Sequence, residues 1–313
     1  MTTLSTEPAA SGLPRCLENA AGAEQELDRI STRTTGQTQR QATVTVEAII
    51  ERVRQEGDAA LMALTQQFDG FLPEPLRVPT SDLQQAWETS PSNLRDALEL
   101  AHRRIQDFHQ RQKPQDLDVQ GVHGERLGRR WRPVQAAGLY VPGGRASYPS
   151  TVLMNAVPAK AAGVEKLVMV TPAGPDGQVN RTVLAAAHLA GVQEVYRIGG
   201  AQAVAALALG TETIPRVDVI SGPGNLYVTL AKKLVYGQVG IDSLAGPSEV
   251  LVIADGSAAV SQVASDLLAQ AEHDPLAAAI LLTTSQPLAD ALPAELENQL
   301  SRHPREAICR QSL

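Results

Sequence analysis

Short apolar runs of four to six residues alternate with amphipathic stretches along the second half of the chain. Runs of this length are typical of strands buried in a parallel sheet. They predict strands over residues 136–141, 167–170, 195–198, 217–220, 250–253 and 278–282. The stretches between them predict helices over residues 151–162, 180–191, 201–209, 225–235, 258–273 and, more weakly, 288–300. This alternation predicts an α/β fold with a mostly parallel sheet, whose ligands bind at the carboxyl ends of the strands.

Helical patterns dominate the first part of the chain. Apolar residues recur at helical spacing over residues 43–68, with an interruption at Gly57, and again over residues 91–108. Between these two segments, three prolines mark a loop with a short extended piece at residues 76–78. Residues 1–20 are rich in Ser, Thr, Pro and Ala, and we expect them to form a loose arm.

Three predicted strands end in glycine-rich turns: PGG at residues 142–144, GG at 199–200 and GPG at 222–224. Glycine lets the backbone approach a ligand closely, and the helix after each turn offers free N–H groups to a phosphate. Alternatively, these glycines only satisfy tight strand-to-helix turns. Three such turns in successive units make a nucleotide site at least as good an explanation. Neither GxGxxG nor GxxxxGKS/T occurs, so we expect any dinucleotide to be held in a non-standard way.

The stretch from residue 245 to residue 275 combines a predicted strand, a polar turn and a helix that Pro275 stops. Gln270 and His273 lie three residues apart near the end of this helix, so they share one face. An amide oxygen and an imidazole nitrogen one turn apart can both reach one metal ion. A histidine in the last turn can instead complement the helix dipole, and the spacing alone favours this second interpretation.

Composition and charge narrow the class of protein. A chain of 313 residues can form two domains, and with 3% aromatic residues their cores must be mostly aliphatic. The net charge of −7 argues against nucleic acid as the main partner, because a phosphate backbone favours a basic face. Cys16 and Cys309 form no disulfide framework, which fits a reducing compartment such as the cytoplasm. No long apolar run or signal-peptide pattern occurs, so we expect neither a membrane span nor secretion.

Eight longer motifs can be read together as one signature. They are QEGDAALMALTQQFDG (55–70), IQDFH (105–109), GLYVPGG (138–144), STVLMNAVPAKAAGV (150–164), GGAQAVAALALGTETIP (199–215), SGPGN (221–225), AGPSEVLVIAD (245–255) and SDLLAQAEHDP (265–275). Together they resemble the histidinol dehydrogenase family. The resemblance covers roughly residues 30–313.

The resemblance implies a fold, a reaction and an assembly. The implied fold has two Rossmann-like βαβ domains with mostly parallel sheets, together with N-terminal helices. The implied division is an arm at residues 1–20, a zinc- and substrate-side domain at 21–136 plus 248–313, and an inserted NAD-binding domain at 137–247. The implied reaction is the last step of histidine biosynthesis, in which a homodimer with zinc oxidises L-histidinol through an aldehyde to L-histidine with two NAD.

The resemblance also implies site residues, by their positions within the motifs. Tyr140 in GLYVPGG, Gln202 in GGAQA and Asn225 in GPGN match residues that contact NAD. Ser248 in AGPSE matches a substrate contact. Gln270 and His273 in QAEH match two zinc ligands that also touch the substrate.

The catalytic Glu-His pair of the family and its two other zinc ligands are expected beyond Leu313. We therefore expect no catalytic base in this chain and an incomplete second sheet. Glu272 and His273 also form a Glu-His pair, but they match the zinc-ligand motif. The leading hypothesis is a histidinol dehydrogenase without its C-terminal part. The alternatives are a paralogous zinc- and NAD-dependent dehydrogenase of another small polar alcohol, and a non-catalytic NAD-binding or assembly protein.

Overall fold

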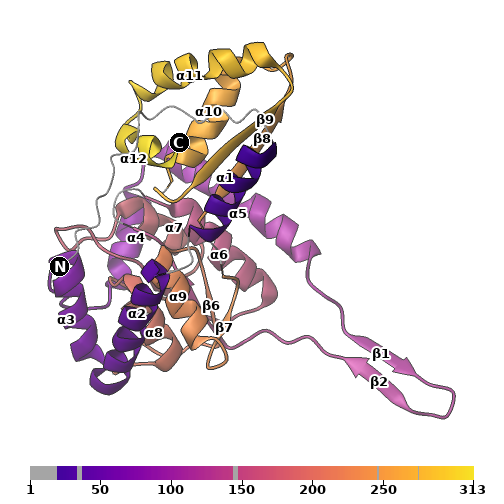
Figure 1. The fold of residues 1–313 in the computed structure, drawn as a ribbon. Coiled ribbons are helices and arrows are strands. Elements are labelled where there is room, and N and C mark those ends of the chain that lie inside the picture. The colour runs from indigo at the N-terminus through magenta and orange to yellow at the C-terminus, as the bar shows by residue number, and fades with distance from the viewer. Residues whose placement is uncertain (1–19, 34–36, 144–146, 245–246, 274) are drawn as a thin grey trace. The chain divides into compact units, whose positions relative to one another are not determined.

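The chain divides into two compact units, residues 41–244 and residues 1–40 together with 245–313 (Figure 1). This computed structural model describes residues 20–33, 37–143, 147–244, 247–273 and 275–313. Residues 1–19 of the expected arm, with Cys16, lie outside the described residues. No helix among the described residues is both long and apolar enough to cross a bilayer.

A five-stranded parallel sheet forms the centre of the unit at residues 41–244. Its strands are β3 (Ala136–Tyr140), β4 (Lys166–Val170), β5 (Glu194–Tyr196), β6 (Val219–Ser221) and β7 (Gly240–Ile241). They lie in the order β5-β4-β3-β6-β7, which is the 3-2-1-4-5 order of a Rossmann sheet. The predicted α/β fold with a parallel sheet is confirmed, and β7 is a strand that the apolar pattern did not reveal.

Helices cover both faces of this sheet and form two cores. One core includes residues from α2 (Gln37–Glu56), α3 (Asp58–Asp69), α8 (Gly200–Leu209) and α9 (Leu226–Val235). The other includes residues from α4 (Thr80–Glu88), α5 (Ser92–Arg111), α6 (Pro149–Ala162) and α7 (Arg181–Leu189). Helices α2 to α5 therefore pack in the same unit as the five-stranded sheet, although the resemblance groups residues 21–136 with the C-terminal part. The assignment of NAD and zinc to separate domains stays a prediction.

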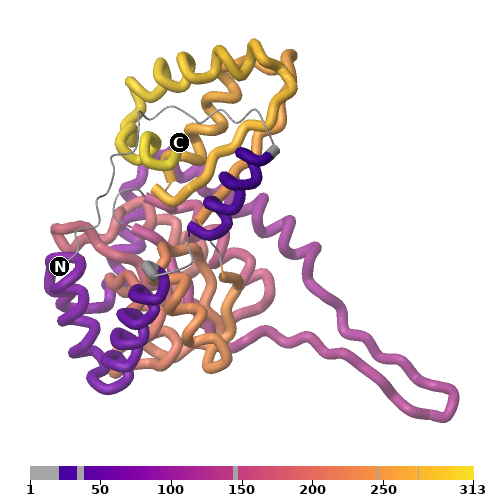
Figure 2. Tube along the Cα trace, viewed as in Figure 1, coloured from indigo at the N-terminus to yellow at the C-terminus, as the bar shows by residue number. Residues whose placement is uncertain are grey.

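A β-hairpin extends from this unit (Figure 2). Its strands, β1 (Leu117–Gln120) and β2 (Arg126–Arg129), pair antiparallel, and every residue of both strands is exposed. Directly opposed residues share a face, so Val119 and Leu127 lie on the same side as Leu117. Arg129, opposite Leu117, also lies on this side, so the exposed apolar residues Leu117, Val119 and Leu127 have a charged residue at one end.

The second unit contains a two-stranded parallel sheet, formed by β8 (Glu249–Ala254) and β9 (Ala278–Thr283). Its helices are α1 (Ala20–Thr32), α10 (Val260–Ala271), α11 (Gln286–Leu300) and α12 (Glu306–Ser312). The core lies between the strands and α10, α11 and α12. The predicted strands and the crossover helix are confirmed, and α12 was not predicted.

Two details of the second unit correct the sequence analysis. Residues 250–253 were expected to be buried on both sides, but Leu251 is 56% and Ile253 is 74% exposed. Only Val250 and Val252 face the core, because α10, α11 and α12 pack on one side of the sheet. The helix that was expected to reach His273 ends at Ala271, and Glu272 caps it.

Candidate functional site

The carboxyl edge of the five-stranded sheet gathers three of the predicted site residues. Tyr140 ends β3, Gln202 lies in the first turn of α8, and Asn225 follows β6 as the N-cap of α9. The chain runs from β3 through β4 to β5 on one side and from β6 to β7 on the other. The switch point of the sheet therefore lies between β3 and β6, where ligands of such sheets bind.

Tyr140 joins the end of β3 to the beginning of α8. The backbone N–H of Gly200 donates a hydrogen bond of 3.1 Å to the Tyr140 Oη. Tyr140 and Gln202 are 5% and 2% exposed, and a side chain at Gly200 would meet the Gln202 amide. Burial raises the pKa of Tyr140 to about 12, against the opposing effect of the Gly200 hydrogen bond. The structure thus brings Tyr140 and Gln202 together, with the phenol neutral.

Asn225 is the exposed member of this group. Its Oδ1 accepts a hydrogen bond of 3.1 Å from the backbone N–H of Val228. This contact satisfies one of the N–H groups left free at the beginning of α9. The remaining polar atom of the Asn225 amide stays available at the surface of the carboxyl edge.

The glycine-rich turns make close contacts within the protein. A Cβ at Gly143 or Gly199 would come within 2.8 Å of Pro172. A Cβ at Gly222 would lie 2.0 Å from the Tyr140 carbonyl oxygen, and the φ of Gly222 is +129°. The alternative of tight packing therefore accounts for glycine at these three positions, while Gly144 lies outside the described residues.

An ion pair between the buried side chain of Lys232 and the partly exposed side chain of Asp242 holds the Gly222 turn. Lys232 of α9 is 4% exposed, and its Nζ contacts the Asp242 carboxylate and donates to the Gly222 carbonyl over 3.1 Å. Asp242 Oδ2 accepts the Gly222 N–H over 2.9 Å. Burial by itself would raise the pKa of Asp242, but hydrogen bonds from Gly222, Lys232 and Ser243 hold it below its ordinary value.

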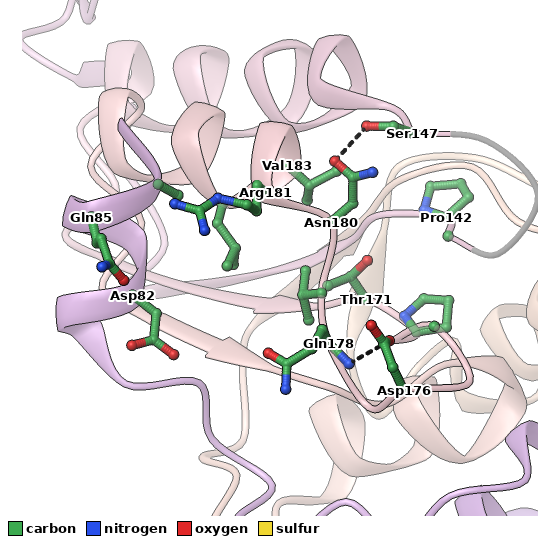
Figure 3. Close-up of a pocket in the computed structure, with 16 residues that line it drawn as sticks. Asp82, Gln85, Pro142, Ser147, Thr171, Asp176, Gln178, Asn180, Arg181 and Val183 are labelled. Carbon is green, nitrogen blue, oxygen red and sulfur yellow. Dashed lines mark hydrogen bonds between the residues drawn. The ribbon is translucent and has the colours of Figure 1, made fainter. Parts of the chain in front are cut away.

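A cavity of about 580 Å³ lies on the α4 and α7 side of the same edge (Figure 3). This volume is within the range of small-molecule sites. Its polar lining residues are Asp82, Gln85, Ser147, Thr171, Asp176, Gln178, Asn180 and Arg181. Asn180 caps α7, because its Oδ1 accepts the Thr182 N–H over 2.9 Å. Pro142 and Gly143 of the predicted PGG turn also line it, while the other polar lining residues were not identified from the sequence, because they come from three separate segments.

The three predicted substrate and zinc residues lie at one edge of the second unit. Ser248 directly precedes β8, and its carbonyl accepts the Ala278 N–H at the beginning of β9 over 3.1 Å. The crossover helix α10 runs back from the end of β8, so Gln270 and His273 come to this same edge. It is the amino edge of the strands, whereas the general rule for parallel sheets favours the carboxyl edge.

The same fold appears in known proteins of one family. The model of the histidinol dehydrogenase family matches residues 32–313. The histidinol dehydrogenases of Prochlorococcus marinus and Parasynechococcus marenigrum are 70% and 64% identical to the chain, over 97% and 96% of it and 69% and 68% of their own lengths. The chain belongs to the histidinol dehydrogenase family. It is therefore related to oxidoreductases of histidine biosynthesis.

A solved histidinol dehydrogenase supports this membership in three dimensions. The crystal structure of the protein from Elizabethkingia anophelis is 35% identical and superimposes with a TM-score of 0.86. The similarity covers 97% of this chain and 70% of that one. The family resemblance inferred from the motifs is confirmed, as is the observation that the chain is shorter than its relatives.

The two expected zinc ligands, Gln270 and His273, have different surroundings. The Nε2 atom of Gln270 is buried and has no hydrogen-bond partner within the described part of the chain, while His273 is exposed. The His273 N–H donates to the Gln270 carbonyl over 3.2 Å, so the chain turns tightly between the two. The described residues contain no group of three His, Cys, Asp or Glu side chains that could hold a metal. Two donors are fewer than the four of a closed zinc site.

Arg33 is a further residue at this edge that the sequence did not reveal. Its guanidinium forms an ion pair of 2.9 Å with Glu249 and donates to the carbonyls of Leu276 and Pro247. It thereby ties the segments before β8 and β9 together around Ser248. No local pattern predicts this contact, because Arg33 is more than 200 residues away from its partners in the sequence.

Proposed function

We propose that the chain binds NAD at the carboxyl edge of its five-stranded sheet and takes part in the oxidation of L-histidinol to L-histidine. The observation that carries this proposal is the 70% identity to a histidinol dehydrogenase along nearly the whole chain. The position of Tyr140, Gln202 and Asn225 around the switch point supports the cofactor assignment. Bound NAD would supply a hydride acceptor for each of the two oxidation steps.

The residues of this chain then have binding roles. Asn225 offers its exposed amide to the dinucleotide, and Tyr140 and Gln202 support it from beneath as a neutral, buried pair. Ser248 is proposed to contact the substrate. The proton of the substrate hydroxyl is assigned to the Glu-His pair of the family, which the resemblance places beyond Leu313. Glu272 has a different role, because it pairs with His303 over 3.4 Å.

Zinc is part of the proposal with a limited role for this chain. Gln270 and His273 are proposed as two of its ligands and as contacts of the substrate. The unpartnered buried atom of Gln270 is the donor Nε2, so it supports a missing hydrogen-bond acceptor at that position, while the metal ligand would be the amide oxygen. The remaining ligands are assigned to the C-terminal part of the family, and no chemical step is derived through the metal.

We also propose a homodimer in the cytoplasm, as in the family resemblance. The apolar side of the hairpin supports an association surface, because Leu117, Val119 and Leu127 are between 48% and 70% exposed. Sedimentation should show self-association that Leu127→Glu weakens and Gln120→Glu, on the polar side of the same hairpin, leaves unchanged. A chain that stays monomeric at all concentrations, or equal effects of both variants, would contradict the dimer surface.

The proposed function is tested by calorimetric titration of NAD into the purified chain. One NAD should bind per chain, and Asn225→Ser should weaken binding by about tenfold, because serine keeps the helix cap but removes the amide. Thermal unfolding of the variant should be close to that of the parent chain. Absence of NAD binding by a folded chain would contradict the proposal.

Activity is measured as NADH formation with L-histidinol and zinc. We expect none from this 313-residue chain, because the catalytic base is assigned to the C-terminal part. Zinc-dependent NADH formation would show that residues within the chain supply the base, and the assignment beyond Leu313 would be wrong. Turnover of a different small alcohol in preference to L-histidinol would contradict the substrate assignment.

A further inference from the structure

We propose that Lys232 and Asp242 act as a clamp on the Gly222 peptide and position Asn225 for NAD. This inference rests on the proposed NAD site. Neither residue is assigned a contact with the dinucleotide. Both are positioning residues, which act on the ligand through the backbone of the turn at residues 221–225, here called the Gly222 turn.

The clamp holds one residue by both of its backbone polar groups. Lys232 Nζ donates to the Gly222 carbonyl over 3.1 Å, and the Asp242 carboxylate accepts the Gly222 N–H over 2.9 Å. The ammonium and the carboxylate also contact each other. The carboxylate additionally accepts the Ser243 N–H over 2.7 Å, which ties it to the segment after β7. The peptide planes on either side of Gly222 can therefore reorient only if a charge-assisted hydrogen bond breaks.

The pair has an energetic cost that packing alone does not explain. Burying an ammonium group costs several kcal/mol unless it is paired and hydrogen-bonded. An apolar residue at position 232 would lie in a stretch of α9 where Leu230, Ala231 and Val235 are buried as well. Such a replacement, made together with removal of the partner charge, is often neutral or stabilising. The ion pair thus contributes something other than stability, and its hydrogen bonds define what that is: a fixed Gly222 peptide.

The fixed peptide leads directly to the site. On one side, Gly222 lies so close to the Tyr140 carbonyl that a Cβ would be 2.0 Å from the oxygen. On the other side, the chain continues through Pro223 and Gly224 to Asn225, which begins α9. Lys232 lies on that same helix, so the clamp joins the N-cap, the turn and the end of β3 into one rigid piece. A turn released from the clamp would move the Asn225 amide relative to Tyr140.

The test compares Lys232→Met, the double variant Lys232→Met/Asp242→Asn, and Lys166→Met in the full chain. Lys166 pairs with Glu194 over 3.2 Å at the opposite edge of the sheet, so its variant removes an ion pair without touching the turn. NAD affinity is measured by calorimetry, stability by thermal unfolding, and turn mobility by hydrogen exchange of the backbone amides of residues 221, 222, 224 and 225.

For Lys232→Met we expect NAD affinity to fall by about tenfold and exchange in the turn to quicken by a similar factor, with lowered stability. The double variant should regain stability, since no unpaired charge remains, but it should not regain NAD affinity. Lys166→Met should change neither affinity nor exchange in the turn. A double variant that regains both stability and NAD affinity would overturn the proposal, because the pair would then be structural only.

The NAD site and the Lys232–Asp242 clamp can be refuted separately. If the folded parent chain binds no NAD, the proposed NAD site is wrong. Hydrogen exchange still decides on the clamp in that case. Unchanged exchange of the Gly222 amide in Lys232→Met would show that the pair does not hold the turn, whatever the ligand.

Discussion

At the residue scale, Tyr140 links strand and helix through one phenolic oxygen. The Gly200 N–H that donates to this oxygen is one of the first amides of α8, which are otherwise candidates for binding an anion. Tyr140 therefore occupies part of the helix terminus that the glycine pattern suggested for phosphate. A phosphate of a bound dinucleotide at this terminus would therefore have to use N–H groups other than that of Gly200.

The phenol of Tyr140 should resist alkaline titration. Its pKa is about 12 in the folded state, against an ordinary value near 10. Between these values the unfolded chain releases the proton and the folded chain keeps it, so this group's stabilising contribution is lost as pH rises through that window. In the folded state, the Tyr140→Phe variant and the parent chain should show the same tyrosinate absorbance up to about pH 11. In denaturant they should differ by one tyrosine, and an equal difference in the folded state would refute the burial argument.

Gly222 should tolerate a side chain far less well than another glycine with the same backbone preference. In Gly222→Ala the alanine must adopt a φ of +129°, and its Cβ clashes with the Tyr140 carbonyl. In Gly237→Ala the alanine must adopt a φ of +99°, but its Cβ meets nothing within 4 Å. The second variant should lose about 1 kcal/mol and the first clearly more. Chemical denaturation measures both. Equal losses would show that the close approach to Tyr140 carries no cost.

At the scale of elements, the sequence predicted the helices and strands whose own apolar residues pack against a core. The strands β3, β4, β5, β6, β8 and β9 and the helices between them were predicted because each carries its own apolar pattern. The hairpin was missed because Leu117, Val119 and Leu127 face no core, and its short strands contain polar residues. The burial of Lys232 and the contacts of Arg33 were missed because their partners are set by the fold. The site residues came from motif resemblance, and spacing alone favoured an ordinary helix end for His273.

The two sides of β8 should respond differently to truncation. Val252 packs against the core of its unit, while Ile253 next to it is 74% exposed. Val252→Ala should lower the free energy of unfolding by about 1 kcal/mol, and Ile253→Ala should change it by less than about 0.5 kcal/mol. Denaturant unfolding of the second unit measures this difference. A larger loss at Ile253 would show that its side of the strand is covered in solution.

At the scale of the whole molecule, the two units differ in how they use the chain. The unit at residues 41–244 is continuous in sequence, and both of its cores consist of residues from that range. The other unit combines residues 1–40 with 245–313, and its core comes from residues after 249. The larger unit thus has the properties of an independently folding domain.

Residues 41–244 expressed alone should therefore unfold cooperatively. We expect a single thermal transition by circular dichroism, and NAD binding within about threefold of the full chain, because Tyr140, Gln202 and Asn225 all lie within this range. A fragment that folds but binds no NAD would show that the second unit supplies part of the NAD site. A fragment without a cooperative transition would contradict the independence of the unit.

The hydrogen bonds of Lys232 and Asp242 to the same residue, Gly222, also constrain which substitutions evolution can accept. Loss of Asp242 leaves the buried ammonium of Lys232 without its counter-charge, and loss of either residue leaves one polar group of Gly222 without its partner. Single replacements at either position should therefore be eliminated, while joint replacement would be retained only in lineages that no longer depend on the turn. Across descendants of this gene, positions 222, 232 and 242 are expected to be inherited as one unit. Their joint loss would mark a chain that no longer binds NAD.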